Sequence, residues 1–128
     1  MGLLLDTHTL LWWVEDAPQL SVLARNSIME ASGPVYVSLV SVWELAIKIS
    51  LGKLKLALPV KHYVPYHLAV NGFTQLSIEF SDISQIEALP LHHRDPFDRL
   101  LIVQAQAKDL KIISADKGFD RYDITRIW

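Results

Sequence analysis

The chain has 128 residues, 51% hydrophobic and 20% charged, and this size and composition predict one compact domain over residues 1–128. It contains no cysteine, which excludes a disulfide framework, a thiol nucleophile and cysteine-ligated zinc. A net charge of -2 excludes a strong overall attraction to nucleic acid, so a phosphate-rich substrate would have to be held by local basic groups or by metal.

Short apolar segments alternate with helical patterns along the chain. A short apolar run bounded by turn residues predicts a buried strand, and capping residues with glycine or proline stops predict helices. In chain order we expect a strand over 2–6, helices over 9–15 and 21–32, a strand over 35–38, a helix over 41–51, a helix over 60–70 that bends or breaks at Pro65, a strand over 73–78, helices over 81–89 and 97–108, and strands over 111–114 and 124–128. This alternation predicts an α/β fold with a mostly parallel sheet and helices on both faces.

Capping residues mark the predicted starts of several helices. Thr9 and Ser81 are expected to cap the first and fifth helices. The segment from Ser41 to Glu44 has the form of a capping box, in which the glutamate side chain returns a hydrogen bond to the serine backbone. Asp95 is followed by proline, the typical pair for an N-cap and the first helical position.

Four carboxylates lie far apart in the sequence, each beside an apolar segment: Asp6, Glu44, Asp98 and Asp116. The first and last directly follow predicted buried strands, whose carboxyl ends form the edge where α/β sheets bind ligands. Clustered carboxylates repel one another unless protons or cations neutralise them. Hard oxygen ligands suit Mg²⁺ or Mn²⁺, so the four acids predict a divalent metal site.

Each of these acids also has a structural explanation. Asp6 could simply be the polar residue that ends a strand, and Asp116 could simply be the residue that forms a turn. Glu44 could serve the capping box and pair with Lys48 four residues later. Asp98 could simply be a negative charge in the first turn of a helix, where it interacts favourably with the helix dipole. Asp95 is explained fully as an N-cap and is therefore an additional candidate ligand rather than a principal one.

The motifs taken together resemble the PIN-domain ribonucleases, specifically the VapC-type toxins of bacterial toxin-antitoxin pairs. The resemblance runs through four segments in order: LLLDTHTLLWW at 3–13, SVWELAIK at 41–48, HRDPFDRLLIVQA at 93–105 and IISAD at 112–116. It implies a three-layer α/β/α fold with strand order 3-2-1-4-5, which would bring the first and last acids together. It also implies that Asp6, Glu44, Asp98 and Asp116 are the catalytic and metal-binding acids, that Asp95 is an extra acid, and that Ser114 helps hold the last acid or a water.

The same resemblance implies an activity and partners. The expected protein is an endoribonuclease that uses Mg²⁺ or Mn²⁺ and a metal-activated water to hydrolyse RNA phosphodiester bonds. A small cognate antitoxin and a homodimer are implied as well. No apolar run approaches the ~18 residues that cross a membrane, and no basic leader precedes an apolar stretch, so we expect a cytoplasmic protein without a membrane partner.

Basic residues near the acids are candidates for holding the substrate. Lys48, Arg94 and Arg99 could contact phosphates, and His8 and His93 flank acids, although a solvated surface also explains basic side chains. The five histidines lack the spacing of a zinc site, so histidine is not expected as a ligand.

Two other functions fit parts of the sequence. One is an RNA-processing PIN nuclease without an antitoxin. The other is a non-nuclease domain that binds Mg²⁺ as a phosphoacceptor or interacts with a partner. A phosphoacceptor site needs paired acids after the first strand, and only Asp6 stands there. An interaction domain would be expected to lack some of the four acids.

Overall fold

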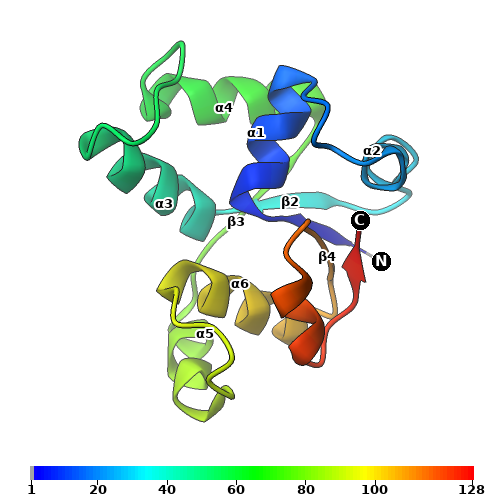
Figure 1. Cartoon of the computed structure of the whole chain (residues 1–128), viewed down its shortest axis with the longest axis vertical. Helices are drawn as coiled ribbons and strands as arrows, with labels where there is room; N and C mark the ends of the chain where they lie inside the picture. Colours follow the sequence, from blue (N-terminus) through cyan, green and yellow to red (C-terminus); the bar gives the residue numbers. More distant parts are fainter. Residues whose placement is uncertain (1) are drawn as a thin grey trace.

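A five-stranded parallel sheet forms the centre of the computed structural model, which describes residues 2–128 (Figure 1). Its strands are β1 (Leu3–Leu5), β2 (Val35–Ser38), β3 (Thr74–Leu76), β4 (Lys111–Ile113) and β5 (Arg126–Ile127). The strand order is β3-β2-β1-β4-β5, and every neighbouring pair is parallel. Leu5 pairs with Val37 on one side and Ile113 on the other, so β1 and β4 end side by side. The predicted fold class and strand order are confirmed.

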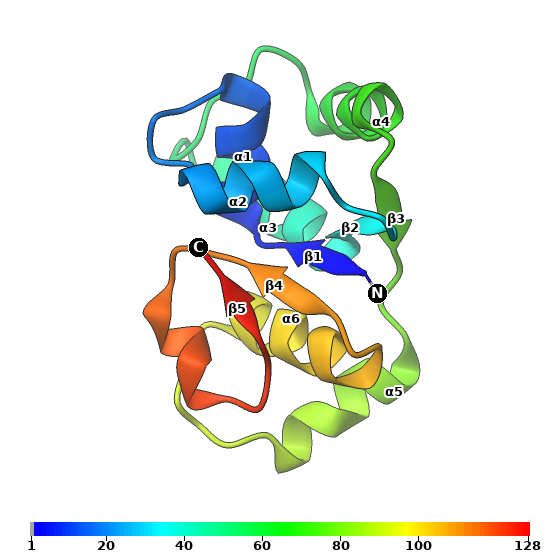
Figure 2. The same ribbon diagram turned by 90° about the vertical axis from the view of Figure 1, so that its right-hand side faces the viewer.

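Helices cover both faces of this sheet (Figure 2). They are α1 (Thr7–Glu15), α2 (Val22–Met29), α3 (Leu39–Ser50), α4 (Val60–Asn71), α5 (Phe80–Gln85) and α6 (Pro96–Ala107), with short 3-10 helices η1 (Ile86–Ala88) and η2 (Lys117–Arg121). Helices α1 and α2 lie on one side of the sheet, and α5 and α6 lie on the other (Figure 2). Within residues 2–128, no helix combines the length and hydropathy needed to cross a bilayer.

Alternate residues of the central strands enter different hydrophobic clusters. Leu5 belongs to the cluster that includes residues of α1 and α2, whereas Leu4 belongs to the cluster that includes residues of α6. The neighbouring β4 residues Ile113 and Ile112 divide in the same way. Both sides of the central strands are therefore buried, which explains why their sequences are continuously apolar rather than alternating. The charged residues that follow them are held at the sheet edge.

Three helices begin differently from the sequence-based expectation. Helix α1 is capped by Asp6 instead of Thr9. Helix α3 is capped by Ser38, whose hydroxyl accepts from the backbone N–H of Val40 at 3.0 Å, so the predicted capping box at 41–44 is wrong. Helix α5 starts at Phe80 rather than after a Ser81 cap. In the first two cases, the strand passes directly into the helix, and the polar residue at the junction becomes the cap.

Helix α4 is continuous through Pro65, so an interruption there is wrong. A proline removes one backbone donor, and the helix retains its bonds on either side. It ends at Asn71, and its C-cap Gly72 has a φ of 66°, the left-handed conformation that glycine adopts without a steric penalty.

Candidate active site

The carboxylate of Asp6 is fixed by hydrogen bonds at the end of β1. Its Oδ1 accepts from the backbone N–H of Thr9 at 2.8 Å, which is the N-cap contact of α1. The Thr9 hydroxyl lies between Asp6 Oδ1, at 2.6 Å, and the carbonyl oxygen of Ile113, at 2.8 Å. The Ser114 hydroxyl donates to Asp6 Oδ2. Burial raises the pKa of Asp6, and the bonds from Ser114 and Thr9 oppose this rise.

Ser114 connects the acids that follow the two central strands. Besides donating to Asp6, its Oγ accepts from the backbone N–H of Asp116 at 3.0 Å. The predicted supporting residue therefore contacts both the first and the last acid. Asp116 caps η2 by accepting from the backbone N–H of Gly118 at 2.8 Å. Burial raises the pKa of Asp116, but the bonds from Gly118 and His93 outweigh burial and leave the pKa below its usual value.

Glu44 projects from the middle of α3 and is buried. Its Oε1 accepts from the hydroxyl of Thr7 at 2.7 Å, and its Oε2 pairs with Lys48 Nζ at 2.7 Å. The Ser41 hydroxyl lies 3.0 Å from that of Thr7, so the serine expected to begin α3 instead packs against α1. The predicted i,i+4 pair with Lys48 is present. Glu44 is thus held by Thr7 of the neighbouring helix α1 and by Lys48 one turn along its own helix, instead of by the terminus of α3.

The negative charges of all the other predicted acids act on the carboxylate of Asp98. Its pKa is raised to about 7, first by burial and then by the negative charges of Asp95, Glu44, Asp116 and Asp6. Asp95 is the N-cap of α6, since its Oδ1 accepts from the backbone N–H of Phe97 at 2.8 Å. Five acids from four separate segments of the sequence therefore lie near one edge of the sheet, and burial together with the charges of the other four disfavours the charged form of Asp98.

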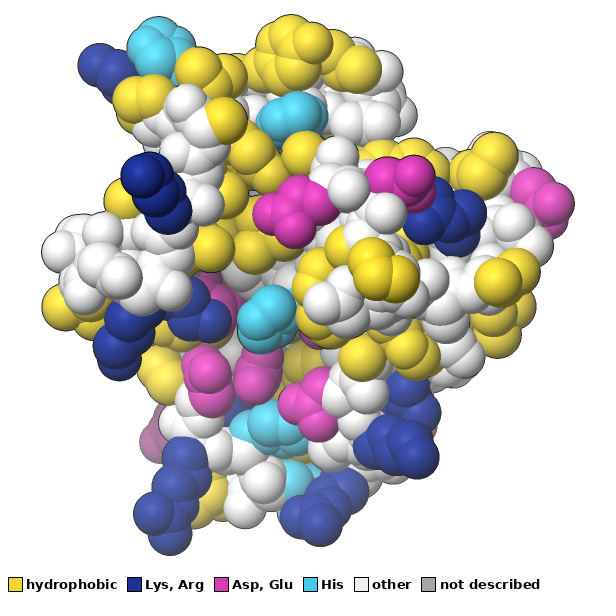
Figure 3. All heavy atoms as spheres, turned by 45° about the horizontal axis from the view of Figure 1, so that its top comes forward, with side chains coloured by type: hydrophobic (Ala, Val, Ile, Leu, Met, Phe, Trp, Pro, Cys, Tyr) yellow, Lys and Arg dark blue, Asp and Glu magenta, His cyan; other side chains and the backbone are white. Residues whose placement is uncertain are grey.

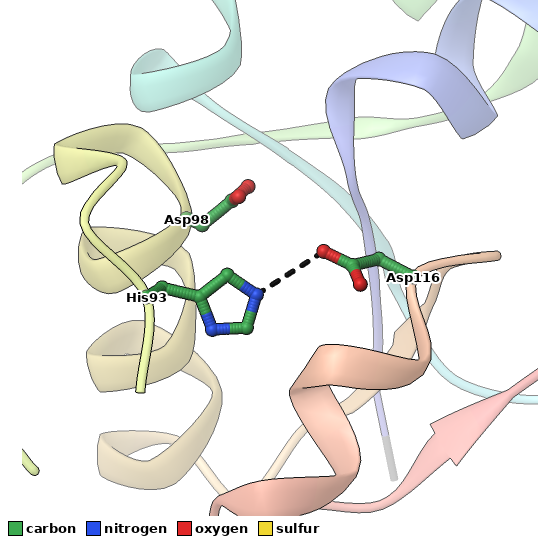
Figure 4. A group of neighbouring side chains, drawn as sticks. All are labelled: His93, Asp98 and Asp116. Carbon is green, nitrogen blue, oxygen red and sulfur yellow. Dashed lines mark hydrogen bonds and ion pairs between the residues drawn. The ribbon is translucent and has the colours of Figure 1, made fainter. Parts of the chain in front are cut away.

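A histidine that was not expected as a ligand lies among these acids. His93, Asp98 and Asp116 each offer a ligand atom, and these atoms lie within 4.8 Å of one another (Figure 4). Within residues 2–128, Asp6 and Glu44 lie outside this group of three, although their charges act on Asp98. The signal for His93 in the sequence was its place just before the Asp-Pro-Phe-Asp segment.

The candidate substrate-binding residues occupy different environments. His8 is exposed and its ring stacks on Trp12 at a centroid distance of 5.4 Å. Arg94 is exposed, and Lys48 is paired with Glu44. Acidic side chains and histidines gather on one face of the molecule, with lysines and arginines around them (Figure 3).

Arg99 is buried, and its guanidinium is engaged by backbone. It donates to carbonyl oxygens of the segment that precedes α6: Ile86, Leu89, Pro90 and His93. This arrangement favours a structural role for Arg99 over the phosphate contact expected from the sequence. The arginine holds the segment that carries His93.

We expect Asp98→Asn to remove part of the pH dependence of stability in the metal-free protein. Because the folded pKa of about 7 exceeds the ordinary value of 3.8, the folded state binds this proton more tightly than the unfolded state. The group's contribution to stability is therefore complete below pH 3.8 and is lost as the pH rises through about 7. Urea unfolding in a chelator at pH 5 and pH 8 should show a larger fall for the wild type than for the variant.

Asp120→Asn is the matched control for that comparison, because Asp120 is an exposed acid paired with Arg126 at 2.9 Å. Its variant should retain the wild-type fall in stability between the two pH values. A fall of equal size in Asp98→Asn would contradict the effect of burial and of the neighbouring charges on Asp98.

Asp95→Ala should lower the free energy of unfolding by on the order of 1 kcal/mol, because α6 would lose the side chain that caps its first turn. Asp95→Asn should restore most of this stability, since an asparagine oxygen also accepts from the backbone. Thermal and urea unfolding measure both. Equal stability of the alanine variant and the wild type would contradict the capping role.

Comparisons with known proteins agree with this fold. The family model described as the PIN domain matches residues 3–124. Ribonuclease VapC22 of Mycobacterium tuberculosis is 27% identical over 117 residues, which is 89% of this chain and 86% of the relative.

Two solved structures share the fold. VapBC2 from Rickettsia felis, bound to a promoter DNA fragment, aligns with a TM-score of 0.69 and 12% identity over 98% of this chain and 97% of that chain. DNA-bound VapBC from Salmonella typhimurium aligns with a TM-score of 0.68 and 17% identity over 98% and 96% of the two chains. The family model covers nearly the whole chain, and the strand order agrees with the resemblance found in the sequence. The chain therefore belongs to the PIN-domain family.

Proposed function

We propose that this protein is an endoribonuclease that depends on Mg²⁺ or Mn²⁺ and acts as the toxin of a toxin-antitoxin pair. The observation that carries the proposal is the convergence of five acids at the edge of the sheet where β1 and β4 end side by side. The mycobacterial relative is named a ribonuclease, and it matches most of both chains.

The acidic donor set fits a hard divalent cation. Carboxylate oxygens are the ligands that Mg²⁺ prefers, and the pKa of Asp98 is raised first by burial and then by the negative charges of four neighbouring acids, which a bound cation would offset. The candidate ligands are Asp6, Glu44, Asp98 and Asp116, with Asp95 as an additional candidate. A bound ion would polarise the scissile phosphate and make a bound water more acidic.

The residues of the chain prepare the site for in-line hydrolysis. Thr9 and Ser114 fix the Asp6 carboxylate before any substrate arrives, and Thr7 fixes Glu44. This preorganisation favours a metal site over a phosphoacceptor, because both oxygens of Asp6 already accept hydrogen bonds. Exposed Arg94 and His8 are candidates for contacts to RNA phosphates or bases.

The direct test is cleavage of a mixed RNA pool by pure protein, with mapping of new 5′ ends. Cleavage should require added Mg²⁺ or Mn²⁺, and a chelator should abolish it. Single-stranded DNA of the same sequences serves as the control substrate. Metal-independent cleavage, or no cleavage of any RNA, would contradict the proposal.

The antitoxin is proposed by analogy with a solved toxin-antitoxin complex from Klebsiella pneumoniae that shares the fold. A homodimer is proposed from the family resemblance. Expression of the chain alone should arrest growth of a bacterial host, and co-expression of a small protein from the neighbouring gene should restore it. Arrest without any neutralising neighbour would favour an RNA-processing nuclease. Size-exclusion chromatography with light scattering tests the homodimer.

A further inference from the structure

His93 lies among the acids at the sheet edge, within reach of both Asp98 and Asp116. It stands on the segment before α6, and its Nε2 is 3.1 Å from Asp116 Oδ2 (Figure 4). Its side chain is only 12% exposed. A polar ring this well covered beside a carboxylate requires either a ligand or a defined hydrogen bond.

Contacts from several elements hold His93 in place. Its ring stacks on Phe119 of η2 at a centroid distance of 5.2 Å and an interplanar angle of 19°. Its backbone N–H donates to the Tyr122 hydroxyl at 2.8 Å, and its carbonyl oxygen accepts from the buried Arg99 guanidinium at 3.4 Å. Both the backbone and the ring of His93 are therefore fixed relative to the last acid.

Gly118 provides the space that the ring occupies. A Cβ at this position would lie 2.8 Å from His93 Cε1 and Nε2 and 3.0 Å from Asp116 Oδ1. The φ of this glycine lies outside the left-handed region, so an alanine would not strain the backbone. Glycine is therefore required at this position because a side chain would block the approach of His93 to Asp116, and not because the turn needs a special backbone conformation.

The surroundings of the two ring nitrogens distinguish a hydrogen-bond donor from a metal ligand. A ligating imidazole usually donates its other N–H to an acceptor, and His93 Nδ1 is buried without any partner among the described residues. A proton on Nδ1 would therefore be a buried, unsatisfied donor, and it would leave the Nε2 lone pair facing a carboxylate oxygen. The tautomer with the proton on Nε2 avoids both of these costs and leaves on Nδ1 only an acceptor without a donor.

We propose that His93 is a positioning residue whose Nε2–H donates to Asp116 Oδ2 and sets the orientation of that carboxylate beside Asp98. Gly118 holds the other oxygen, since its backbone N–H donates to Asp116 Oδ1 at 2.8 Å. The inference rests on the proposed function, because the oriented carboxylate is one of the proposed metal ligands. His93 acts through Asp116 and contacts neither metal nor RNA.

The tautomer can be read directly in the metal-free wild-type protein. Long-range ¹H–¹⁵N correlation spectra distinguish a protonated Nε2 from a protonated Nδ1. The expected result is a proton on Nε2 of His93, and it should remain there when Mg²⁺ is added. A proton on Nδ1, in the metal-free or the metal-bound protein, would overturn the proposal and indicate direct ligation.

Variants test the role of the hydrogen bond in metal binding. His93→Leu keeps an apolar contact to Phe119 but removes the donor, and Gly118→Ala pushes the ring away from Asp116. Both should weaken Mn²⁺ binding, followed by electron paramagnetic resonance, by roughly 10- to 100-fold, the usual loss when a residue that orients a ligand is replaced. His93→Gln should recover much of the affinity because its amide can donate.

His92→Gln is the matched control, because the neighbouring imidazole is exposed and contacts the Tyr122 ring instead of an acid. It should bind Mn²⁺ like the wild type. Equal Mn²⁺ affinity in His93→Leu and the wild type, or no recovery in His93→Gln, would overturn the positioning role.

Three further measurements separate this role from folding and from the proposed function. Thermal unfolding of each variant checks the fold; if His93→Leu does not fold, Gly118→Ala and the wild-type tautomer still decide the matter. At saturating metal, the loss in the variants should appear in kcat with KM for RNA unchanged. Wild-type protein that binds Mn²⁺ but cleaves no RNA would contradict the nuclease while leaving the binding comparison valid.

Discussion

Asp6→Asn is expected to reduce metal-dependent RNA cleavage by roughly 100- to 1000-fold, the range seen when one group that stabilises transition-state charge is lost. The substitution exchanges one carboxylate oxygen for an amide nitrogen. The remaining oxygen can still accept from the backbone N–H of Thr9, and asparagine is as good an N-cap as aspartate. The new amide can donate to Ser114 Oγ, so the local contacts persist while the negative charge is lost.

The stability of Asp6→Asn separates a site defect from a folding defect. Since the pKa of Asp6 is raised, the folded state disfavours its charge, and a neutral residue should leave the metal-free protein at least as stable at neutral pH. Urea unfolding in a chelator measures this, and Asp120→Asn again controls for loss of a nearby exposed charge. Cleavage at the wild-type rate by folded Asp6→Asn would remove this residue from the mechanism.

Glu44→Gln should produce the second large effect, a marked rise in the Mg²⁺ concentration needed for cleavage. The amide oxygen can still accept from Thr7, so the contact between α1 and α3 remains. Lys48 loses its anionic partner, but it is partly exposed and can turn to solvent. The thermal stability should change little, whereas a hard anionic oxygen is lost from the candidate site.

Lys48→Met separates the role of Glu44 from the role of its ion pair. Loss of the lysine, a candidate contact to phosphate, should raise KM for RNA without changing the Mg²⁺ requirement. A metal titration of RNA cleavage by both variants decides between the roles. An unchanged rate and an unchanged Mg²⁺ requirement in Glu44→Gln would reduce Glu44 to an ordinary partner of Lys48 and leave three principal acids.

The sheet and the acids at its edge were predictable because each depends on a local pattern. Three leucines followed by Asp6, and two isoleucines shortly before Asp116, mark buried strands that end in a charge. The helix starts were harder. Ser38 and Ser41 are both suitable caps. The choice between them depends on how closely β2 is followed by α3, and the local sequence does not determine this.

The contacts of Arg99 and His93 were not predictable from sequence patterns. An arginine on the first turn of a helix looks the same whether it faces solvent or backbone carbonyls. Here the path of residues 86–93 brings four backbone carbonyl oxygens within hydrogen-bonding distance of the Arg99 guanidinium. The position of His93 depends in turn on this segment and on the glycine of η2, which is distant in sequence. Tertiary packing determines both contacts.

The burial of the acids and their mutual repulsion have a genetic consequence. Substitutions that neutralise Asp6 or Asp98 should relieve the metal-free chain of an unfavourable charge, so alleles that lose activity at these positions should still accumulate as folded protein. Selection in a growing culture for survivors of the proposed toxin would then recover them as full-length, stable proteins alongside truncations. Such survivors would keep the outer surface of the chain, and with it any capacity to bind and titrate a neutralising partner.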